Sequence, residues 1–364
     1  MPTYRTFLRS LTFICVAAAS ACSPTPEDRP RASPWIAGPT LPQPITNNAV
    51  AAVESDGRTS VFSFLGLDST KAWSGVTNAA YRWDVGDDAW REIEPVPGPG
   101  RLASTAQTVD GLIYVFGGYT VAEDGAEKSL PDVNVYDPVA ESWNRVADIP
   151  VPTDDAAAGV WRGDRIVLVS GWHDTGNIRD VQIYHPATDT WTASTPIPGA
   201  PVFGHTGAVV GDQVVYVDGA AIVEARPRFV VDSTSWTGTL SRVAEPSIDW
   251  TEAPRHPGPP LYRSGAATVG GLALFVGGTD NPYNYDGVGY NGAASVPLRQ
   301  VLAYVPATEE WRYLPALPVA TMDHRNAGVA GGRIFVVGGM LEGQRVSDQV
   351  WLATASGLLE VGRQ

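Results

Sequence analysis

Short apolar runs bounded by turn residues recur along most of this chain. In Thr108–Gly118, Asp-Gly precedes the run Leu-Ile-Tyr-Val-Phe and Gly-Gly follows it; Val269–Gly278 and Ala330–Gly339 repeat this arrangement with Gly-Gly turns. Asp-Gly and Gly-Gly supply the positive φ that a two-residue hairpin turn needs, while β-branched and aromatic residues favour strands. Each copy therefore predicts two antiparallel strands joined by a tight turn, the second strand being the more apolar.

A third strand and a tryptophan-bearing fourth strand are expected after each of these hairpins. Val133–Pro138 is one third strand, and Tyr–Trp pairs recur seven residues apart across the last hairpin, at Tyr136/Trp143, Tyr184/Trp191 and Tyr304/Trp311. Six tryptophans are each followed seven residues later by proline: Trp35, Trp90, Trp143, Trp191, Trp250 and Trp311. Their spacings of 55, 53, 48, 59 and 61 residues indicate a repeat protein.

Composition agrees with a turn-rich, all-β, soluble protein. The 364 residues include 38 Gly and 30 Pro, and 44% of the residues are hydrophobic, which argues against a disordered chain. The 25 basic and 39 acidic residues give a formal net charge of −14, which disfavours nucleic acid or an anionic membrane surface as a partner.

The first residues are expected to be an export signal and not part of the fold. Arg5 and Arg9 precede an apolar run at 11–20 that is too short to span a bilayer, and small residues follow it. The segment up to Cys22 resembles a bacterial lipobox, although Ala19 stands where leucine is usual. We therefore expect a signal peptide at 1–21, a lipid-carrying Cys22 with a Pro-rich tether at 22–34, and an outer-membrane or periplasmic lipoprotein. The alternative is simple secretion after cleavage behind Ala21.

The Gly-Gly doublet, the Tyr-Asp-Pro-like turn and the following Trp resemble the kelch repeat over about residues 35–357. The resemblance implies a six-bladed β-propeller over 35–364, with one four-stranded blade per repeat. Three blades depart from the doublet, with Leu65-Gly66, Ser170-Gly171 and Asp218-Gly219 in its place. The last repeat has Leu358 where its fourth-strand Trp would stand, so the N-terminal strand around Trp35 is expected to complete that blade and close the ring.

This topology places two sets of loops at one mouth of the central channel: those leading into the first strands and those following the second strands. The leading loops carry Arg101, Asp154, Asp155, His205, Arg263, His324 and Arg325, and the later loops carry Tyr119, Trp172, His173, Glu224, Arg226, Arg228, Asp280, Asn281, Tyr283 and Tyr285. The predicted ligand-binding residues are Arg101, Asp155, His173, Arg226, Arg263, Asp280, Asn281, Tyr283, Tyr285, His324 and Arg325. Carboxylates, guanidiniums and aromatic faces suit a polyol or a sugar acid. Packing roles for Arg101, His205 and Arg325 are the alternative, and the long insertion at 279–299 is expected to be ordered.

Among bacterial kelch proteins, the chain looks most like the periplasmic N-acetylneuraminate epimerases. That resemblance implies Glu224 as the acid–base residue and Arg228 or Arg226 as a carboxylate clamp, with His205 or Asp155 as a second proton-transfer group. In that family the Glu and Arg are six residues apart, whereas here the separations are four and two. Galactose oxidase has a related propeller, but its radical cofactor needs a Cys, and the only cysteines here, Cys15 and Cys22, lie in the leader.

Two classes of function therefore remain open. The first is a binding module that holds a small carbohydrate or a protein partner at the channel mouth, with membrane contact only through a lipid at Cys22. The second is a sugar-acid mutarotase or epimerase. Neither needs a metal or a cofactor, and a monomer is expected in both cases.

Overall fold

The computed structural model describes residues 1, 33–241 and 246–361. The chain divides into two units, Met1–Ala32 and Ser33–Gln364, and the description below concerns the second. The predicted signal peptide, the lipid-carrying Cys22 and nearly all of the tether lie outside the described residues.

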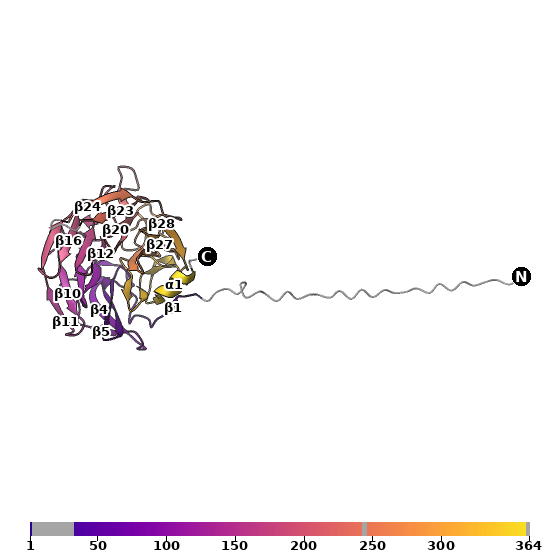
Figure 1. The fold of residues 1–364 in the computed structure, drawn as a ribbon, viewed down its shortest axis with the longest axis horizontal. Helices are drawn as coiled ribbons and strands as arrows, with labels where there is room; N and C mark the ends of the chain where they lie inside the picture. Colours follow the sequence, from indigo (N-terminus) through magenta and orange to yellow (C-terminus); the bar gives the residue numbers. More distant parts are fainter. Residues whose placement is uncertain (2–32, 242–245, 362–364) are drawn as a thin grey trace. The chain divides into compact units, whose positions relative to one another are not determined.

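Six four-stranded antiparallel sheets make up the described fold, and they are called blades 1 to 6 here (Figure 1). Blade 1 contains β2 (Ala49–Ser55), β3 (Arg58–Leu67), β4 (Val76–Asp84) and β5 (Arg91–Ile93). Blade 2 contains β6 (Thr105–Val109), β7 (Leu112–Phe116), β10 (Val133–Asp137) and β11 (Ser142–Arg145), and blade 3 contains β12 (Ala157–Trp161), β13 (Arg165–Val169), β16 (Val181–His185) and β17 (Thr190–Ala193). Blade 4 contains β19 (Thr206–Val210), β20 (Gln213–Val217), β23 (Ser235–Leu240) and β24 (Ile248–Glu252), and blade 5 contains β25 (Gly265–Val269), β26 (Leu272–Val276), β27 (Val301–Val305) and β28 (Glu310–Leu314). Blade 6 contains β29 (Gly328–Ala330), β30 (Arg333–Val337), β33 (Val350–Thr354) and β1 (Ile36–Ala37).

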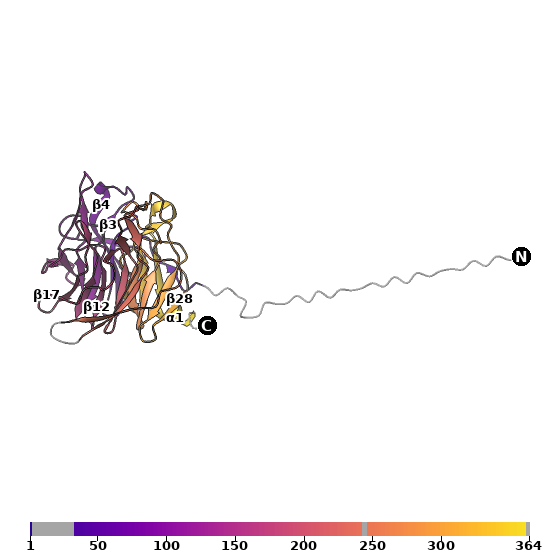
Figure 2. The same ribbon diagram turned by 90° about the horizontal axis from the view of Figure 1, so that it is seen from above.

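The blades form a closed ring around a central channel. Each first strand contacts the next in the order β2, β6, β12, β19, β25 and β29, and β29 contacts β2 again. Figures 1 and 2 show this ring from two directions. The predicted closure by the N-terminal strand is confirmed, because β1 pairs with β33. In this pairing, Ile36 lies opposite Leu352, and Ala37 lies opposite Trp351. β1 thus supplies the fourth strand of blade 6 and pairs the edge that β33 would otherwise expose.

The six repeated tryptophans link each blade to its neighbour. Every one of their indole N–H groups donates to a backbone carbonyl that lies four residues beyond the preceding tryptophan of the series, over 2.7–3.2 Å. Trp90 donates to Pro39, for example, and Trp35 donates to Pro315, which closes the circuit. The Tyr–Trp pairing across the last hairpin is also confirmed, with Tyr136 opposite Trp143 and ring centroids 4.9 Å apart. The repeated aromatic positions are thus structural.

The doublet after each second strand keeps one conformation even where the sequence departs from Gly-Gly. Leu65-Gly66, Ser170-Gly171 and Asp218-Gly219 have positive φ at both positions, as the Gly-Gly pairs do. A Cβ at Gly171 would lie 2.5 Å from the carbonyl oxygen of Asp154, so the second position has no room for a side chain. The first position accepts a residue at a cost in backbone strain.

Small elements at the mouth extend from these doublets. They are the hairpins β8 (Tyr119–Val121)/β9 (Glu127–Ser129), β14 (Trp172–His173)/β15 (Gly176–Asn177) and β31 (Met340–Leu341)/β32 (Arg345–Val346), the sheet of β18 (Val202–Phe203), β21 (Ala220–Ile222) and β22 (Phe229–Val231), and the 3₁₀ turns η2 (Trp73–Gly75) and η3 (Glu342–Gln344). The blade-5 insertion contains the isolated bridges Tyr283–Gly289 and Val288–Ala294, and its Tyr283 is fully buried. Helix α1 (Ala355–Val361) follows β33. Among the described residues, no helix has both the length and the apolar character needed to cross a membrane.

The ring closure makes a first prediction about stability. We expect Trp35→Ala to lower the free energy of unfolding by about 3–5 kcal/mol, because it empties a buried site and breaks the link to blade 5. Trp35→Phe, which loses mainly the indole hydrogen bond, should cost about 0.5–1.5 kcal/mol. Urea unfolding measures both. Trp73, which is 44% exposed, supplies the matched control in Trp73→Ala; equal effects of the two alanine variants would contradict the closure role of Trp35.

Candidate functional site

The loops that lead into the first strands meet at the axis of the ring. In all six, the equivalent residue has a positive φ between 50° and 68°; these residues are Asn47, Ala103, Asp155, Gly204, Arg263 and Asp323. Backbone hydrogen bonds join four of the six neighbouring pairs directly, as in Gly204 N–H to the Asp155 carbonyl at 3.1 Å and Arg263 N–H to the Gly204 carbonyl at 2.7 Å. Of the other two links, one runs from the Ala103 N–H to the side-chain oxygen of Asn47, and the other runs from the His324 N–H to the Arg263 carbonyl. This backbone chain holds the side chains of different blades at the same level of the channel.

Four of the charged side chains at this level form a buried ion cluster. Arg263 donates through Nε and Nη2 to the two oxygens of Asp155 at 3.2 and 2.7 Å, and its Nη1 lies 3.4 Å from Asp323 Oδ1. Arg325 Nε lies 2.9 Å from Asp155 Oδ1, and Arg325 Nη1 lies 3.5 Å from Asp323 Oδ1. Thr46 also donates to Asp323, at 2.6 Å. Two positive and two negative groups from blades 3, 5 and 6 therefore neutralise one another at the axis.

Two adjacent aromatic rings pack against Arg263. Its guanidinium carbon lies 5.1 Å from the ring centres of both Tyr262 and Tyr283. Tyr283, from the blade-5 insertion, lies edge-on to Tyr262, whose hydroxyl donates to the Tyr283 carbonyl at 3.0 Å. Cation–π contacts add to the ion pairs when the cation is desolvated, as it is here. The insertion thus positions Arg263 rather than presenting Tyr283 to a ligand.

A cavity of about 170 Å³ lies directly above this cluster, and we call it the mouth pocket. Its lining combines three carboxyl groups, two guanidiniums, one amide and five aromatic rings: Glu127, Asp154, Asp155, Arg228, Arg263, Asn284, Tyr119, Trp172, Phe203, Phe229 and Tyr290. Trp172, Phe203 and Phe229 contact one another with centroids 5.4–5.8 Å apart, and Tyr290 lies 4.3 Å from Phe229. One wall of the pocket is therefore aromatic, and carboxyl groups line another part of it.

The two adjacent aspartates of the pocket differ in ionisation. Burial by itself would raise the pKa of Asp155. The positive charges of Arg263 and Arg325 have the larger effect, and they hold the pKa of Asp155 below its usual range. Burial and the charge of Asp155 raise the pKa of Asp154 well above its usual range, although Ser129 donates to Asp154 Oδ2 at 2.5 Å. Glu127 is exposed over much of its surface, yet the residue lines the pocket, and partial burial of its carboxyl raises its pKa. The pocket thus places a carboxyl group shifted towards the ionised form beside one shifted towards the protonated form, a combination used for acid–base work.

Several predicted site residues lie at this pocket. Asp155, Arg263 and Arg228 line it, and Arg325 lies beneath it in the ion cluster. His173 lies on β14, next to Trp172, and is half-buried. These residues come from blades 3 to 6, and only the ring topology brings them together.

Other predicted residues lie elsewhere. Arg101 is buried and donates to Asn134 at 2.9 Å, His205 contacts the Val169 carbonyl at 2.9 Å, and His324 contacts Thr321 at 2.9 Å. Burial lowers the pKa of both histidines to about 4, so each is neutral near neutral pH. Asn281 bonds within its own loop, Asp280 is exposed and Tyr285 is half-buried. None of these six is among the lining residues of the mouth pocket.

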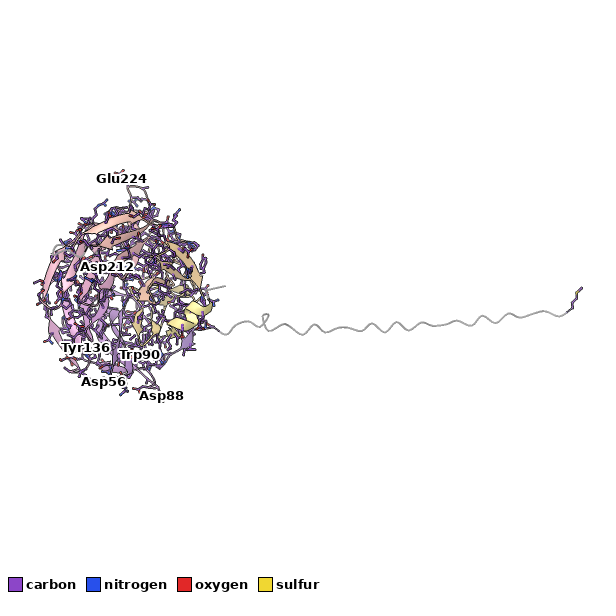
Figure 3. All side chains as sticks on the ribbon, in the orientation of Figure 1. Asp56, Asp88, Trp90, Tyr136, Asp212 and Glu224 are labelled. Carbon is purple, nitrogen blue, oxygen red and sulfur yellow. The ribbon has the colours of Figure 1, made fainter. Side chains whose placement is uncertain are left out.

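Glu224 and Arg226 are exposed residues in the turn between β21 and β22. Figure 3 shows Glu224 at the periphery of the blades, away from the centre of the ring. A second cavity of about 640 Å³ is lined by residues 222–229 and Tyr290. Arg228, Phe229 and Tyr290 line both this cavity and the mouth pocket, so the turn that carries Glu224 borders the pocket from outside.

The sequence reasoning missed Glu127, Phe203 and Phe229 as lining residues. Asn284 and Tyr290 also line the pocket, and they belong to the insertion at 279–299 that the sequence singled out at the mouth. A usable signal existed for Glu127, since the segment between Gly118 and Val133 is longer than a turn requires. Phe203 directly precedes Gly204, whose position at the axis only the aligned backbone reveals. Asp154 was recognised as a leading-loop residue but not as a ligand-binding one.

Below the ion cluster, a separate cavity of about 280 Å³ lies between the first strands. Small residues line most of it, and Asn326 from blade 6 crosses it to bond the backbone of Val50 in blade 1 and of Ala106 in blade 2. Within residues 33–241 and 246–361, no group of three or more His, Cys, Asp or Glu side chains could hold a metal ion.

Comparison with known proteins agrees with this architecture. The profile of the KLHDC2/KLHL20/DRC7 Kelch-repeats domain matches residues 34–220. The N-acetylneuraminate epimerase of Haemophilus influenzae (strain PittEE) is 30% identical over 93 residues, and that of Yersinia enterocolitica is 30% identical over 105 residues. The Kelch-like protein terF of Aspergillus terreus is 30% identical over 136 residues, which cover 36% of this chain and 29% of that protein.

The epimerase matches cover only about a quarter of each protein, 25% of both chains for H. influenzae and 27% of both for Y. enterocolitica. A solved structure described as the structure of YjhT superposes with a TM-score of 0.68 over 86% of this chain and 95% of that chain. Its sequence identity is 17%, so this likeness concerns the fold alone.

The ion cluster makes a second prediction. We expect Arg263→Met to lower the free energy of unfolding by about 3–5 kcal/mol near neutral pH, because it leaves Asp155 and Asp323 short of a buried counter-charge. The partners of Asp155 lower its pKa in the folded protein relative to the unfolded chain. The ion pairs of Asp155 therefore stabilise the fold fully at pH values above its pKa in the unfolded chain. This stabilisation is lost as pH falls through its lower pKa in the folded protein.

Without Arg263, Asp155 takes up a proton at higher pH, so the gap between wild type and variant should narrow as pH falls from about 7 to about 4. Urea unfolding at several pH values measures the gap. Arg145→Met is the matched control, since Arg145 pairs with Asp148 at the surface and should cost at most about 1 kcal/mol. A gap that stays constant with pH would show that Asp155 does not carry the effect.

Proposed function

We propose that this chain, which belongs to the kelch-repeat family, binds a small carbohydrate in the mouth pocket. One observation carries the proposal: carboxyl groups and an aromatic wall from several blades converge on one pocket. Sugar hydroxyls donate to carboxylates, and the apolar C–H faces of a sugar ring pack on aromatic rings. Blades 2 to 5 each contribute lining residues, so the site needs these four blades packed side by side.

The size of the pocket favours a monosaccharide over a longer ligand. About 170 Å³ is less than the roughly 300–1,000 Å³ of pockets for drug-sized ligands. The adjoining cavity of about 640 Å³ leaves room for a substituent or a second residue beyond Phe229 and Tyr290. The proposed ligand therefore has one ring inside the mouth pocket and an open side towards the turn at 223–228.

A second candidate function is a sugar-acid mutarotase of the N-acetylneuraminate epimerase type. The partial matches to such epimerases support it, and so do two carboxyl groups of different ionisation in one pocket. Arg263 and Arg325 are both engaged with Asp155 and Asp323, which leaves Arg228 as the lining guanidinium free to meet a sugar carboxylate. Glu224 lies in the adjoining cavity, so in this candidate it would act on a part of the ligand outside the mouth pocket.

We also propose that the protein is exported and attached to a membrane through a lipid on Cys22. The basic residues, the short apolar run and the small residues before Cys22 support this proposal. A Pro-rich segment at 23–34 would then separate the lipid from the first strand of the ring.

Sugar binding makes a third prediction. Isothermal titration and thermal shift against glucose, galactose, N-acetylglucosamine, glucuronate and N-acetylneuraminate should identify a ligand that stabilises the protein. Glu127→Gln should weaken that ligand about tenfold, the equivalent of about 1.4 kcal/mol from a lost charge-assisted hydrogen bond. Glu123→Gln, an exposed change on the same hairpin, should leave the affinity unchanged. If no sugar binds, the proposal fails and a protein partner becomes the better explanation.

The mutarotase candidate makes a fourth prediction. If the protein interconverts anomers, exchange NMR should show faster exchange of N-acetylneuraminate anomers with protein than without it. Arg228→Met should then reduce the rate for acidic sugars and leave the binding of neutral sugars intact, because only an acidic sugar needs the guanidinium. Stabilisation by a sugar without faster anomer exchange would reject the mutarotase and retain the binding module.

A further inference from the structure

Asp154 differs from every other carboxyl group in the mouth pocket in the way its two oxygens are used. Oδ2 accepts the Ser129 hydroxyl at 2.5 Å. Oδ1 has no hydrogen-bond partner among the described residues, and it is not sealed from solvent as an orphaned buried atom would be. Because Asp154 lines the pocket while the residue as a whole is only 3% exposed, Oδ1 is the carboxyl oxygen left to face the pocket.

Ser129 is itself held in place by a second loop. Its hydroxyl accepts the Asp174 N–H at 3.1 Å, and the Ser129 N–H donates to Asp174 Oδ1 at 3.1 Å. The blade-2 hairpin β8/β9 and the blade-3 hairpin β14/β15 are therefore joined at the point where they position Asp154. The Ser129 hydroxyl has a single hydrogen, and the acceptor it finds among the described residues is Asp154 Oδ2, so a proton on Asp154 belongs to Oδ1.

The charges around Asp154 favour such a proton. Asp155 is the adjacent residue and is kept ionised by Arg263 and Arg325. The charged and titratable groups that act on Asp154 from the packed elements are Asp155, Glu127, Arg263, Tyr119 and Tyr290, with Asp174 behind Ser129. Burial raises the pKa of both tyrosines, which stay neutral, and the charge of Arg263 is shared between Asp155 and Asp323. The negative charges nearest to Asp154 are thus only partly compensated, and its pKa is well above the usual range.

We infer that Asp154 donates a hydrogen bond from its Oδ1 to an oxygen of the ligand in the mouth pocket, with Ser129 as the positioning residue. The inference rests on the proposed carbohydrate function, and it specifies that the protein donates this hydrogen bond and the sugar accepts it. A sugar hydroxyl can donate or accept, but a ring or glycosidic oxygen can only accept. The pocket is therefore suited to a sugar whose ring oxygen, or another oxygen without a hydrogen, lies against Asp154, while Glu127 and Asp155 accept from its hydroxyls.

The test compares two substitutions at one position. Asp154→Asn retains a neutral donor, since its amide can accept from Ser129 through oxygen and point N–H into the pocket. Asp154→Ala removes the donor. For whichever sugar of glucose, galactose, N-acetylglucosamine and N-acetylneuraminate binds the wild type most tightly, we expect the Asn variant to bind within about threefold of the wild type and the Ala variant about tenfold more weakly.

The pH dependence separates this role from a merely structural one. The wild type should lose affinity as pH rises from about 5 to about 9, because the donating proton is lost, whereas Asp154→Asn should bind equally across that range. Ser129→Ala should weaken binding and leave a pH profile of the same sign. Affinity that rises with pH in the wild type, or an Asn variant as weak as the Ala variant, would overturn the donor role.

A readout without ligand completes the experiment. In protein labelled with ¹³C at aspartate, the Cγ resonance of Asp154 is identified as the one that disappears in Asp154→Asn. In the wild type, the chemical shift of this resonance near pH 6 should be that of a neutral carboxyl group. An ionised group at that pH would overturn the inference whatever sugar binds. Absence of binding by every sugar, in protein whose Asp154 is neutral and whose melting curve is normal, would instead overturn the proposed function and this inference with it.

Discussion

The structure depends on closing a ring of six blades with a strand from the far end of the chain. Each repeated tryptophan donates to a carbonyl of the preceding blade, and the last of these bonds joins Trp35 to Pro315 across 280 residues of sequence. Antiparallel pairing of β1 with β33 adds a strand-to-strand contact to the same closure. Without this link, the outer edge of β33 in blade 6 would stay unpaired. The closing interface therefore needs residues from both the first and the last strands of the ring.

Closure has a direct consequence for the site. The leading loops meet at the axis only when all blades are in place, and there their backbones bond one another around the channel. Asp155, Arg263, Asp323 and Arg325 then neutralise one another through direct ion pairs. That arrangement keeps Asp155 ionised and leaves its neighbour Asp154 as the group whose charge is hardest to accommodate. The chemistry proposed for the mouth pocket is therefore a result of how the ring is closed.

The repeat was predictable because each blade follows local rules. Hairpin turns need positive φ, strands need apolar side chains, and Tyr136 and Trp143 face each other wherever a short turn joins the last two strands. The position of the mouth was predictable for the same reason, and Asp155, Arg263 and Arg228, which the sequence placed at the mouth, line the pocket there. Whether a polar side chain at the mouth turns into the pocket or into the blade was not predictable. Arg101 and His205 turn into buried contacts, because the space beside them is set by neighbouring blades.

By itself the sequence determined the blade pattern, the closing role of Trp35 and the end of the channel that carries charge, since all of these follow from residue spacing and hairpin geometry. Only the tertiary structure decided which charges neutralise each other, that Tyr283 supports Arg263 instead of a ligand, and that Glu224 lies towards the periphery. The reason is physical. Ionisation, burial and access depend on groups that lie tens to hundreds of residues apart in sequence, and their distances do not exist until the ring has closed.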